Sequence, residues 1–381
     1  MNPRFTIDGS DSLEMGIHRL CDRLAGGVRS LVPEEKLEGI ALGGGYGRGQ
    51  GGVFKTGEGD RPYNDLEFYV FLRGVRPLNQ RRYQAPLDSL AHECSPPGLH
   101  AEFKIDSLEI LRRGPVSMFS YDLLTGHKIL AGGSSLFHGC EHHLDPRRIP
   151  IGEATRLLFN RCGGLLLAKR LFRKPALSEN DLDFISRNLA KAQLALGDAV
   201  LTALGQYHWD CRERAARLNR LAPDQAPGWL VQVRAHHHEG VDFKLHPRRT
   251  TLAPAQLERA HAALEALALQ LWLWLENRRL SCRFDSPSEY ALSPVAKCPE
   301  TSPWKNYLLN LKTFGLKAGL DPFSCRYPRE RLFNALALLL WNNDLAEKPA
   351  LKRHVQRQLR SDARDWPGLV AAFTQVWPCY G

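Results

Sequence analysis

Residues 42–71 read LGGGYGRGQGGVFKTGEGDRPYNDLEFYVF, a glycine-rich turn followed by a short apolar segment that carries two carboxylates. These are Asp65 and Glu67, two positions apart. In a β-strand, side chains at i and i+2 lie on the same face, roughly 7 Å apart. The residues of the other parity are apolar and would bury the opposite face: Leu66, Phe68 and Val70. The stretch therefore predicts a strand that holds two acids side by side.

Two acids on one strand are suited to bind a divalent cation, since Mg²⁺ prefers carboxylate oxygens. A glycine turn just before the strand can bring backbone N–H groups against phosphates. Together these features predict phosphoryl or nucleotidyl transfer that depends on Mg²⁺.

The composition is that of a globular protein, with 381 residues, 43% hydrophobic and 24% charged. This length favours two domains. The nine cysteines are scattered singly, which argues against a disulfide framework and for a reducing compartment. The most apolar runs, 264–275 and 332–341, are shorter than the ~20 residues of a membrane span. With no signal-like apolar core near the start, we expect a cytoplasmic protein with no membrane partner.

The formal net charge is +10, which suits a polyanionic partner. Nucleotide phosphates fit this charge, and RNA remains open as a second class of partner. The charge alone does not establish nucleic-acid binding, because many basic residues alternate with acids in helical segments.

Hydrophobic periodicity divides the chain into a mixed N-terminal part and a helical remainder. After a first helix over the first 30 or so residues, strands are expected at 37–42, 64–72 and 100–108. Helices are expected at 153–172, 179–206, 254–280, 305–314 and 329–342. We therefore predict an α+β protein: a mixed β-sheet catalytic domain over 1–150, and a C-terminal α-helical bundle domain over 151–381 that would bind the acceptor.

The segment Gly44–Gly49 and the strand motif Asn64-Asp65-Leu66-Glu67 resemble the nucleotidyltransferase superfamily that includes DNA polymerase beta. The sequence is most similar to kanamycin-type aminoglycoside nucleotidyltransferases, which carry a comparable acidic strand and a third strand like Ala101–Ser107. The resemblance covers roughly residues 37–111.

This resemblance implies a catalytic site of three carboxylates. Asp65 and Glu67 would hold Mg²⁺ against the triphosphate. Glu102 would complete a second metal site or take the proton of the acceptor hydroxyl, with Asp106 in reserve. Two ions stabilise the attacking and leaving oxygens of an in-line displacement. Because Glu102 and Asp106 lie ~13 Å apart on a strand, only one of them would reach the metals.

The resemblance also implies contacts to the nucleotide. Gly44, Gly45 and Arg48 belong to the turn that would face the phosphates. Arg187 and Lys191 lie one helical turn apart and are similar to a basic pair that contacts the triphosphate in some relatives.

The sequence departs from the family pattern at two places. Gly45 replaces the usual serine, so backbone N–H groups would have to supply that phosphate contact. An insert at 51–62 lengthens the spacing to Asp65, and we expect it to form a loop over the site in which Lys55 and Arg61 contact phosphate.

The implied reaction transfers a nucleoside monophosphate, most simply AMP from ATP or another nucleoside triphosphate, to a hydroxyl and releases pyrophosphate. The acceptor stays open: a small molecule, tRNA or another RNA, or a protein such as a partner toxin. A regulatory relative that binds nucleotide without catalysis is the other alternative.

Three further stretches are interpreted as structural. His236, His237 and His238 are consecutive, cannot face one ion together, and are expected in a mobile basic loop. Trp272 and Trp274 lie in an apolar helix and are expected in the core. Residues 119–132 are expected to form a last strand and turn.

Overall fold

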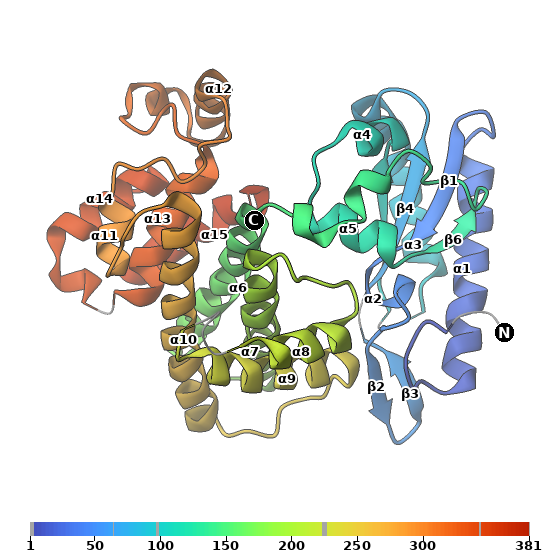
Figure 1. Cartoon of the computed structure of the whole chain (residues 1–381), viewed down its shortest axis with the longest axis horizontal. Helices are drawn as coiled ribbons and strands as arrows, with labels where there is room; N and C mark the ends of the chain where they lie inside the picture. Colours follow the sequence, from blue (N-terminus) through green and yellow to red (C-terminus); the bar gives the residue numbers. More distant parts are fainter. Residues whose placement is uncertain (1–3, 64, 97–98, 223–226, 343, 381) are drawn as a thin grey trace. The chain divides into compact units, whose positions relative to one another are not determined.

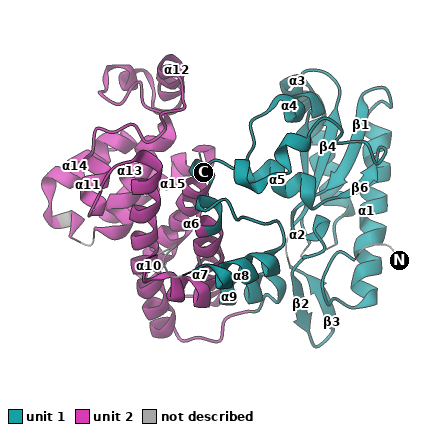
Figure 2. Cartoon of the chain, viewed as in Figure 1, with its two compact units in different colours: residues 1–153, 201–222, 238–248 teal, residues 154–200, 223–237, 249–381 magenta. Residues whose placement is uncertain are grey.

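The computed structural model describes residues 4–63, 65–96, 99–222, 227–342 and 344–380 (Figure 1). The chain divides into two compact units (Figure 2). Unit 1 contains residues 1–153, 201–222 and 238–248, and unit 2 contains 154–200, 223–237 and 249–381. The first division lies close to the expected boundary at 150, but two later segments of the chain belong to unit 1.

Unit 1 contains a four-stranded mixed sheet with the order β5-β4-β1-β6. β4 (Leu66–Leu72) pairs antiparallel with β1 (Leu37–Leu42) and parallel with β5 (Ala101–Asp106). β6 (Lys128–Ala131) pairs antiparallel with the other edge of β1. The structure is thus mixed α/β with a small mixed sheet, as expected, and its three predicted strands are present with slightly shorter bounds at the second and third.

One face of the sheet is covered by two long helices. α1 (Asp11–Leu31) presents an apolar stripe, and α3 (Arg76–Cys94) packs beside it and against β5. The apolar residues of this stripe are buried: Leu13, Ile17, Leu20 and Leu24. On β4, the residues of even number join this core: Leu66, Phe68, Val70 and Leu72.

The opposite face of the sheet is only partly covered. Tyr69 and Phe71 pack with Leu108 of α4 (Leu108–Arg113) and Leu123 of α5 (Met118–Thr125). Glu67 lies on this same face, two residues before Tyr69, where apolar packing ends. The strand therefore buries its even residues fully and leaves one carboxylate at the edge of the second core.

One expectation for unit 1 is wrong and another is confirmed only in part. The insert at 51–62 forms an antiparallel hairpin, β2 (Val53–Thr56) with β3 (Gly59–Pro62), rather than a loop. Residues 119–132 contain the expected last strand, β6, but it is preceded by most of an unexpected helix, α5. A capping box between Ser117 and Ser120 starts this helix.

Several short elements complete unit 1. Their bounds are α2 (Gly44–Gly47), η1 (Glu141–His143), η2 (Pro146–Arg148) and α8 (Cys211–Arg220).

Unit 2 is helical in the part that the structure describes. The end of α7 and the second half of α9 belong to segments of unit 1, and α6 begins three residues before the division. The bounds are α6 (Ile151–Leu171), α7 (Glu179–Ala203), α9 (Leu230–Leu245), α10 (Pro254–Leu280), α11 (Pro287–Leu292), α12 (Pro303–Phe314), η4 (Leu316–Leu320), α13 (Pro328–Trp341), η5 (Leu345–Glu347), α14 (Pro349–Leu359) and α15 (Trp366–Tyr380).

The core of unit 2 is built around Trp272. Its ring is 1% exposed and makes edge contacts with Tyr290 and Phe333, so its expected place in the core is confirmed. Trp274 is half-buried and packs edge-on against Trp229. The segment 222–228 reads APDQAPG, and its Pro and Gly residues predict a break between helices; residues 223–226 of it lie outside the described residues.

The histidine cluster does not form a loop. His236, His237 and His238 lie inside α9, and the buried His237 ring is 3.0 Å from Asp198 Oδ1. Over the described ranges, none of the helices combines the length and apolar character that crossing a membrane requires.

Candidate functional site

Glu67 and Glu102 are direct neighbours in the sheet. The parallel register of β4 and β5 pairs these two residues, so their side chains leave the same face. Lys104, two residues along β5, lies between them: its Nζ is 3.0 Å from Glu67 Oε2 and 3.2 Å from Glu102 Oε2. The two carboxylates therefore converge on a single positive charge.

Tyr69 supports this arrangement from β4. Its hydroxyl donates to Glu67 Oε2 over 2.7 Å, and the Lys104 ammonium lies 5.4 Å from the centre of its ring. Burial alone would raise the pKa of Glu67, but Lys104, the Tyr69 hydroxyl and Arg48 together lower it. Burial and the neighbouring Glu67 raise the pKa of Tyr69, so the hydroxyl keeps its proton and its role as donor.

Lys104 itself is held in the charged form. Partial burial would lower the pKa of its ammonium, but Glu67 and Glu102 raise it above the ordinary value. The cation between the two acids consequently persists across the physiological pH range.

The glycine turn lies against Glu67. Gly44 has φ +61°, the left-handed region that glycine tolerates best, and a Cβ there would be 3.0 Å from Glu67 Oε1. The N–H of Gly43 donates to the Glu67 carbonyl oxygen over 2.9 Å. The first N–H groups of α2 have no partner inside the helix. A Cβ at Gly45 would lie 3.2 Å from the Gln50 carbonyl oxygen, a tight contact.

The other candidate acids differ in their surroundings. Asp65 is exposed just before β4 and makes no hydrogen bond or ion pair within the described ranges. Asp106 pairs in register with Phe71, four positions beyond Glu67, and is 3.4 Å from Arg76 Nη1. Of the two acids considered for the third role, Glu102 rather than Asp106 lies beside Glu67.

The predicted basic phosphate contacts of unit 1 have carboxylate partners of their own. Arg48 is mostly buried and forms an ion pair with Asp122 at 3.1 Å. Lys55 pairs with Asp8 at 3.3 Å, and Arg61 pairs with Glu58 of its own hairpin. Arg187 and Lys191 are exposed on α7 within unit 2, whereas the acids belong to unit 1: Asp65, Glu67, Glu102 and Asp106.

Local sequence patterns did not predict a group of cationic side chains that lies near Arg48 in the interior of unit 1. Asp122 also accepts from the Tyr207 hydroxyl at 3.2 Å, and Arg214 donates to the carbonyl oxygen of His208 at 2.7 Å. Lys244 points its Nζ into the same interior, where the atom is buried and lacks any hydrogen-bond partner among the described residues. Burial lowers the pKa of Lys244 to about 8, with Arg48 contributing further.

This cluster comes from segments that are far apart in the sequence. Arg48 follows α2, Asp122 is in α5, Arg214 in α8 and Lys244 in α9, and all belong to unit 1. No local sequence motif predicts this cluster. Asp122 forms an ion pair with Arg48, and Arg48, Arg214 and Asp122 all lie close enough to Lys244 to shift its pKa.

The residues beside Glu67 suit a cation in their chemistry. Carboxylate oxygens are the ligands that Mg²⁺ prefers, and the two that converge here already enclose a positive charge. Over the described part of the chain there is, however, no group of three or more His, Cys, Asp or Glu side chains placed to hold a metal ion. Glu67 and Glu102 could hold one divalent cation only if it displaced the Lys104 ammonium.

Comparisons with known proteins returned nothing: no protein-family model, curated protein or solved structure matches this chain. The resemblance to nucleotidyltransferases therefore remains a prediction from the residues quoted above.

Proposed function

We propose that this chain is an Mg²⁺-dependent nucleotidyltransferase that moves a nucleoside monophosphate, most simply AMP from ATP, to a hydroxyl acceptor and releases pyrophosphate. The proposal depends on one observation. Glu67 and Glu102 are paired in register on neighbouring strands, and both carboxylates contact the Lys104 ammonium, at 3.0 and 3.2 Å.

Each part of the site has a role in this proposal. Glu67 and Glu102 would hold the Mg²⁺ ion. Asp65, exposed just before β4, would be the third acid of the site. Bound Mg²⁺ would polarise the phosphoryl oxygens and neutralise their charge. Tyr69 keeps Glu67 in position by donating to Oε2. The N–H groups at the start of the glycine turn would donate hydrogen bonds to a phosphate oxygen beside Glu67.

Incubation with each α-³²P nucleoside triphosphate, Mg²⁺ and a cell extract would test the proposal and reveal the acceptor. We expect Asp65→Asn and Glu102→Gln to reduce transfer by on the order of 100-fold or more, because each removes a charge that acts on the reacting phosphate. Glu93→Gln, an exposed change on α3, is the matched control and should keep full transfer. Transfer that survives in both site variants rejects the assignment.

A second candidate function has its own support. The Lys104 ammonium already bridges the two acids, which favours a regulatory protein that binds nucleotide but does not catalyse transfer. In that case calorimetry would detect nucleotide binding, while no pyrophosphate would appear with any acceptor. Labelled RNA or labelled protein in the same assay would instead identify a macromolecular acceptor.

A further inference from the structure

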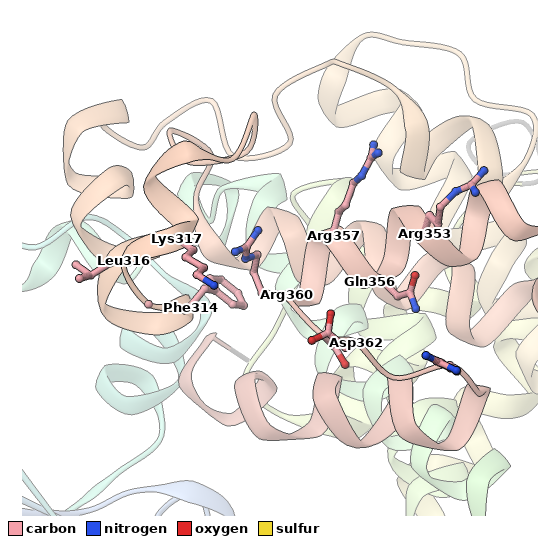
Figure 3. A pocket seen from close by; sticks show the side chains of 11 residues that line it. Phe314, Leu316, Lys317, Arg353, Gln356, Arg357, Arg360 and Asp362 are labelled. Carbon is pink, nitrogen blue, oxygen red and sulfur yellow. The ribbon is translucent and has the colours of Figure 1, made fainter.

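Unit 2 contains a basic hollow that the proposed catalytic site does not use. Its volume is about 970 Å³, and it lies between η4, the C-terminal half of α14 and the segment that follows (Figure 3). Five cationic side chains line it: Lys317, Arg353, Arg357, Arg360 and Arg364. We call these residues and the space between them the basic hollow.

The charge of the basic hollow is not balanced. Asp362 is the one acid in its lining. Arg360 is 3.6 Å from the Asp321 carboxylate, but the same carboxylate also forms an ion pair with the buried Arg331 at 3.3 Å. The other four cations have no acidic partner within 4 Å in the described part of the chain, and all four are exposed: Lys317, Arg353, Arg357 and Arg364. Like charges held this close raise the local potential and attract an anion.

The cations form a series rather than a single cage. Arg353 and Arg357 are four residues apart and share one face of α14. Arg360 caps the helix in the left-handed conformation, with φ 52°. In Figure 3 the side chains of Lys317, Arg360, Arg357 and Arg353 follow one another along the hollow. An extended polyanion would meet several of these charges at once, whereas one phosphate would meet only one or two.

Exposed aromatic rings lie on the neighbouring helix. Trp304 and Tyr307 of α12 are 63% and 37% exposed. α12 packs against η4, where a Cβ at Gly319 would be 2.7 Å from the Tyr307 hydroxyl. The described lining of the hollow includes neither ring, and Phe314 is the residue of α12 that lines it. Exposed aromatic faces near a basic surface are a feature of proteins that bind single-stranded nucleic acid, because unpaired bases stack on them.

We propose that the basic hollow binds single-stranded RNA through its phosphodiester backbone. Guanidinium groups bind phosphate oxygens in pairs, and four arginines and a lysine supply the series of contacts. This binding does not depend on the proposed catalytic function, because every residue that carries it belongs to unit 2.

Fluorescence anisotropy with a labelled oligouridylate of about 12 nucleotides tests this proposal on the full chain. If four phosphates are contacted, raising KCl from 50 to 150 mM should weaken binding by about 20-fold. Arg353→Ala with Arg357→Ala should weaken binding at low salt and reduce that salt effect to about fivefold, since two contacts are lost. The matched control is Arg81→Ala with Arg259→Ala, which removes two exposed cations outside the hollow and should bind as the unchanged protein does.

Three outcomes would overturn the proposal. One is equal loss of affinity in both double variants, which would mean that net charge alone attracts the oligonucleotide. Another is a duplex RNA of the same length competing as well as the single strand. The last is inorganic tripolyphosphate competing equally at the same phosphate concentration, which would show that the hollow takes short polyphosphates instead. Circular dichroism of both variants confirms that the compared proteins are folded.

Discussion

Lys104 controls the charge between the two acids of the candidate site. Its ammonium contacts Glu67 and Glu102 at 3.0 and 3.2 Å, so a divalent ion can reach both carboxylates only by displacing it. Because the two acids raise the pKa of Lys104, a moderate rise in pH does not remove this competition. The lysine thus acts on metal affinity through charge and through the space that it fills.

We expect Lys104→Met to tighten Mn²⁺ or Mg²⁺ binding by about tenfold or more, because it removes a unit charge a few ångströms from the ligands. Isothermal titration calorimetry without nucleotide measures this directly and does not rely on turnover. Lys36→Met, a change on the loop before β1, is the control and should leave the affinity unchanged. Equal metal affinity in the two variants would mean that Glu67 and Glu102 do not hold the ion.

At this scale the sequence predicted part of the site. The alternation of residues along β4 predicted that Glu67 lies on the face opposite the buried residues. The same alternation in the third strand predicted that Glu102 is exposed, as the structure has it. The position of Lys104 between the acids depends on the register of β4 with β5, which no single strand encodes. Arg48 was expected at phosphate but forms an ion pair with Asp122, because α5 comes beside it only in the folded chain.

At the scale of elements, α8 and α9 bring Arg214 and Lys244 into the interior that contains Arg48 and Asp122 of α5. Lys244 on α9 has a buried, unpartnered Nζ, and burial lowers its pKa to about 8. Since the unfolded side chain has a pKa near 10.4, the folded state resists the charged form at neutral pH. Below about pH 8 the buried Lys244 of the native protein is therefore charged, and this charge destabilises the fold.

Lys244→Met should stabilise the fold at pH 7 by on the order of 2–3 kcal/mol, because the buried charge is removed while the volume is kept. Between pH 8 and 10.5 the unfolded state of the unchanged protein binds more protons than its folded state, so its stability rises with pH. The advantage of the variant should accordingly shrink over that range. Thermal unfolding at pH 7, 9 and 10.5 checks it, and an advantage that is constant with pH would contradict the explanation.

Helix and strand periods predicted most long elements but not all of them. α10 was expected at its observed bounds, and α1, α6, α7, α12 and α13 are close to expectation. α3 was missed because it contains Pro86, and only four of its 19 residues are buried, one of them polar: Asn79, Tyr83, Leu87 and Ala91. The expected loop at 236–238 is part of α9, where the burial of His237 against Asp198 outweighs its polar composition.

At the scale of the whole molecule, the division into units could not be predicted from the order of the sequence. Composition suggested a change of character near 150. Which later segments join unit 1 depends on individual contacts. Tyr207 stacks edge-on against Tyr121, Cys211 N donates to Gln50 Oε1 at 3.3 Å, and Phe243 meets the ring of Tyr63. These pairs join residues 86 to 180 positions apart, so local patterns do not reveal them.

The same contacts predict that residues 1–153 will not fold independently. A fragment that ends at Glu153 lacks 201–222 and 238–248, which leaves Tyr121 and Gln50 without these partners. We expect this fragment alone to show no cooperative thermal transition by near-ultraviolet circular dichroism. Co-expression with 154–381 restores the missing segments, so the two pieces should purify together and unfold cooperatively. The fragment alone could instead unfold cooperatively, at the temperature at which the intact chain unfolds. That result would mean that unit 1 does not need the two later segments.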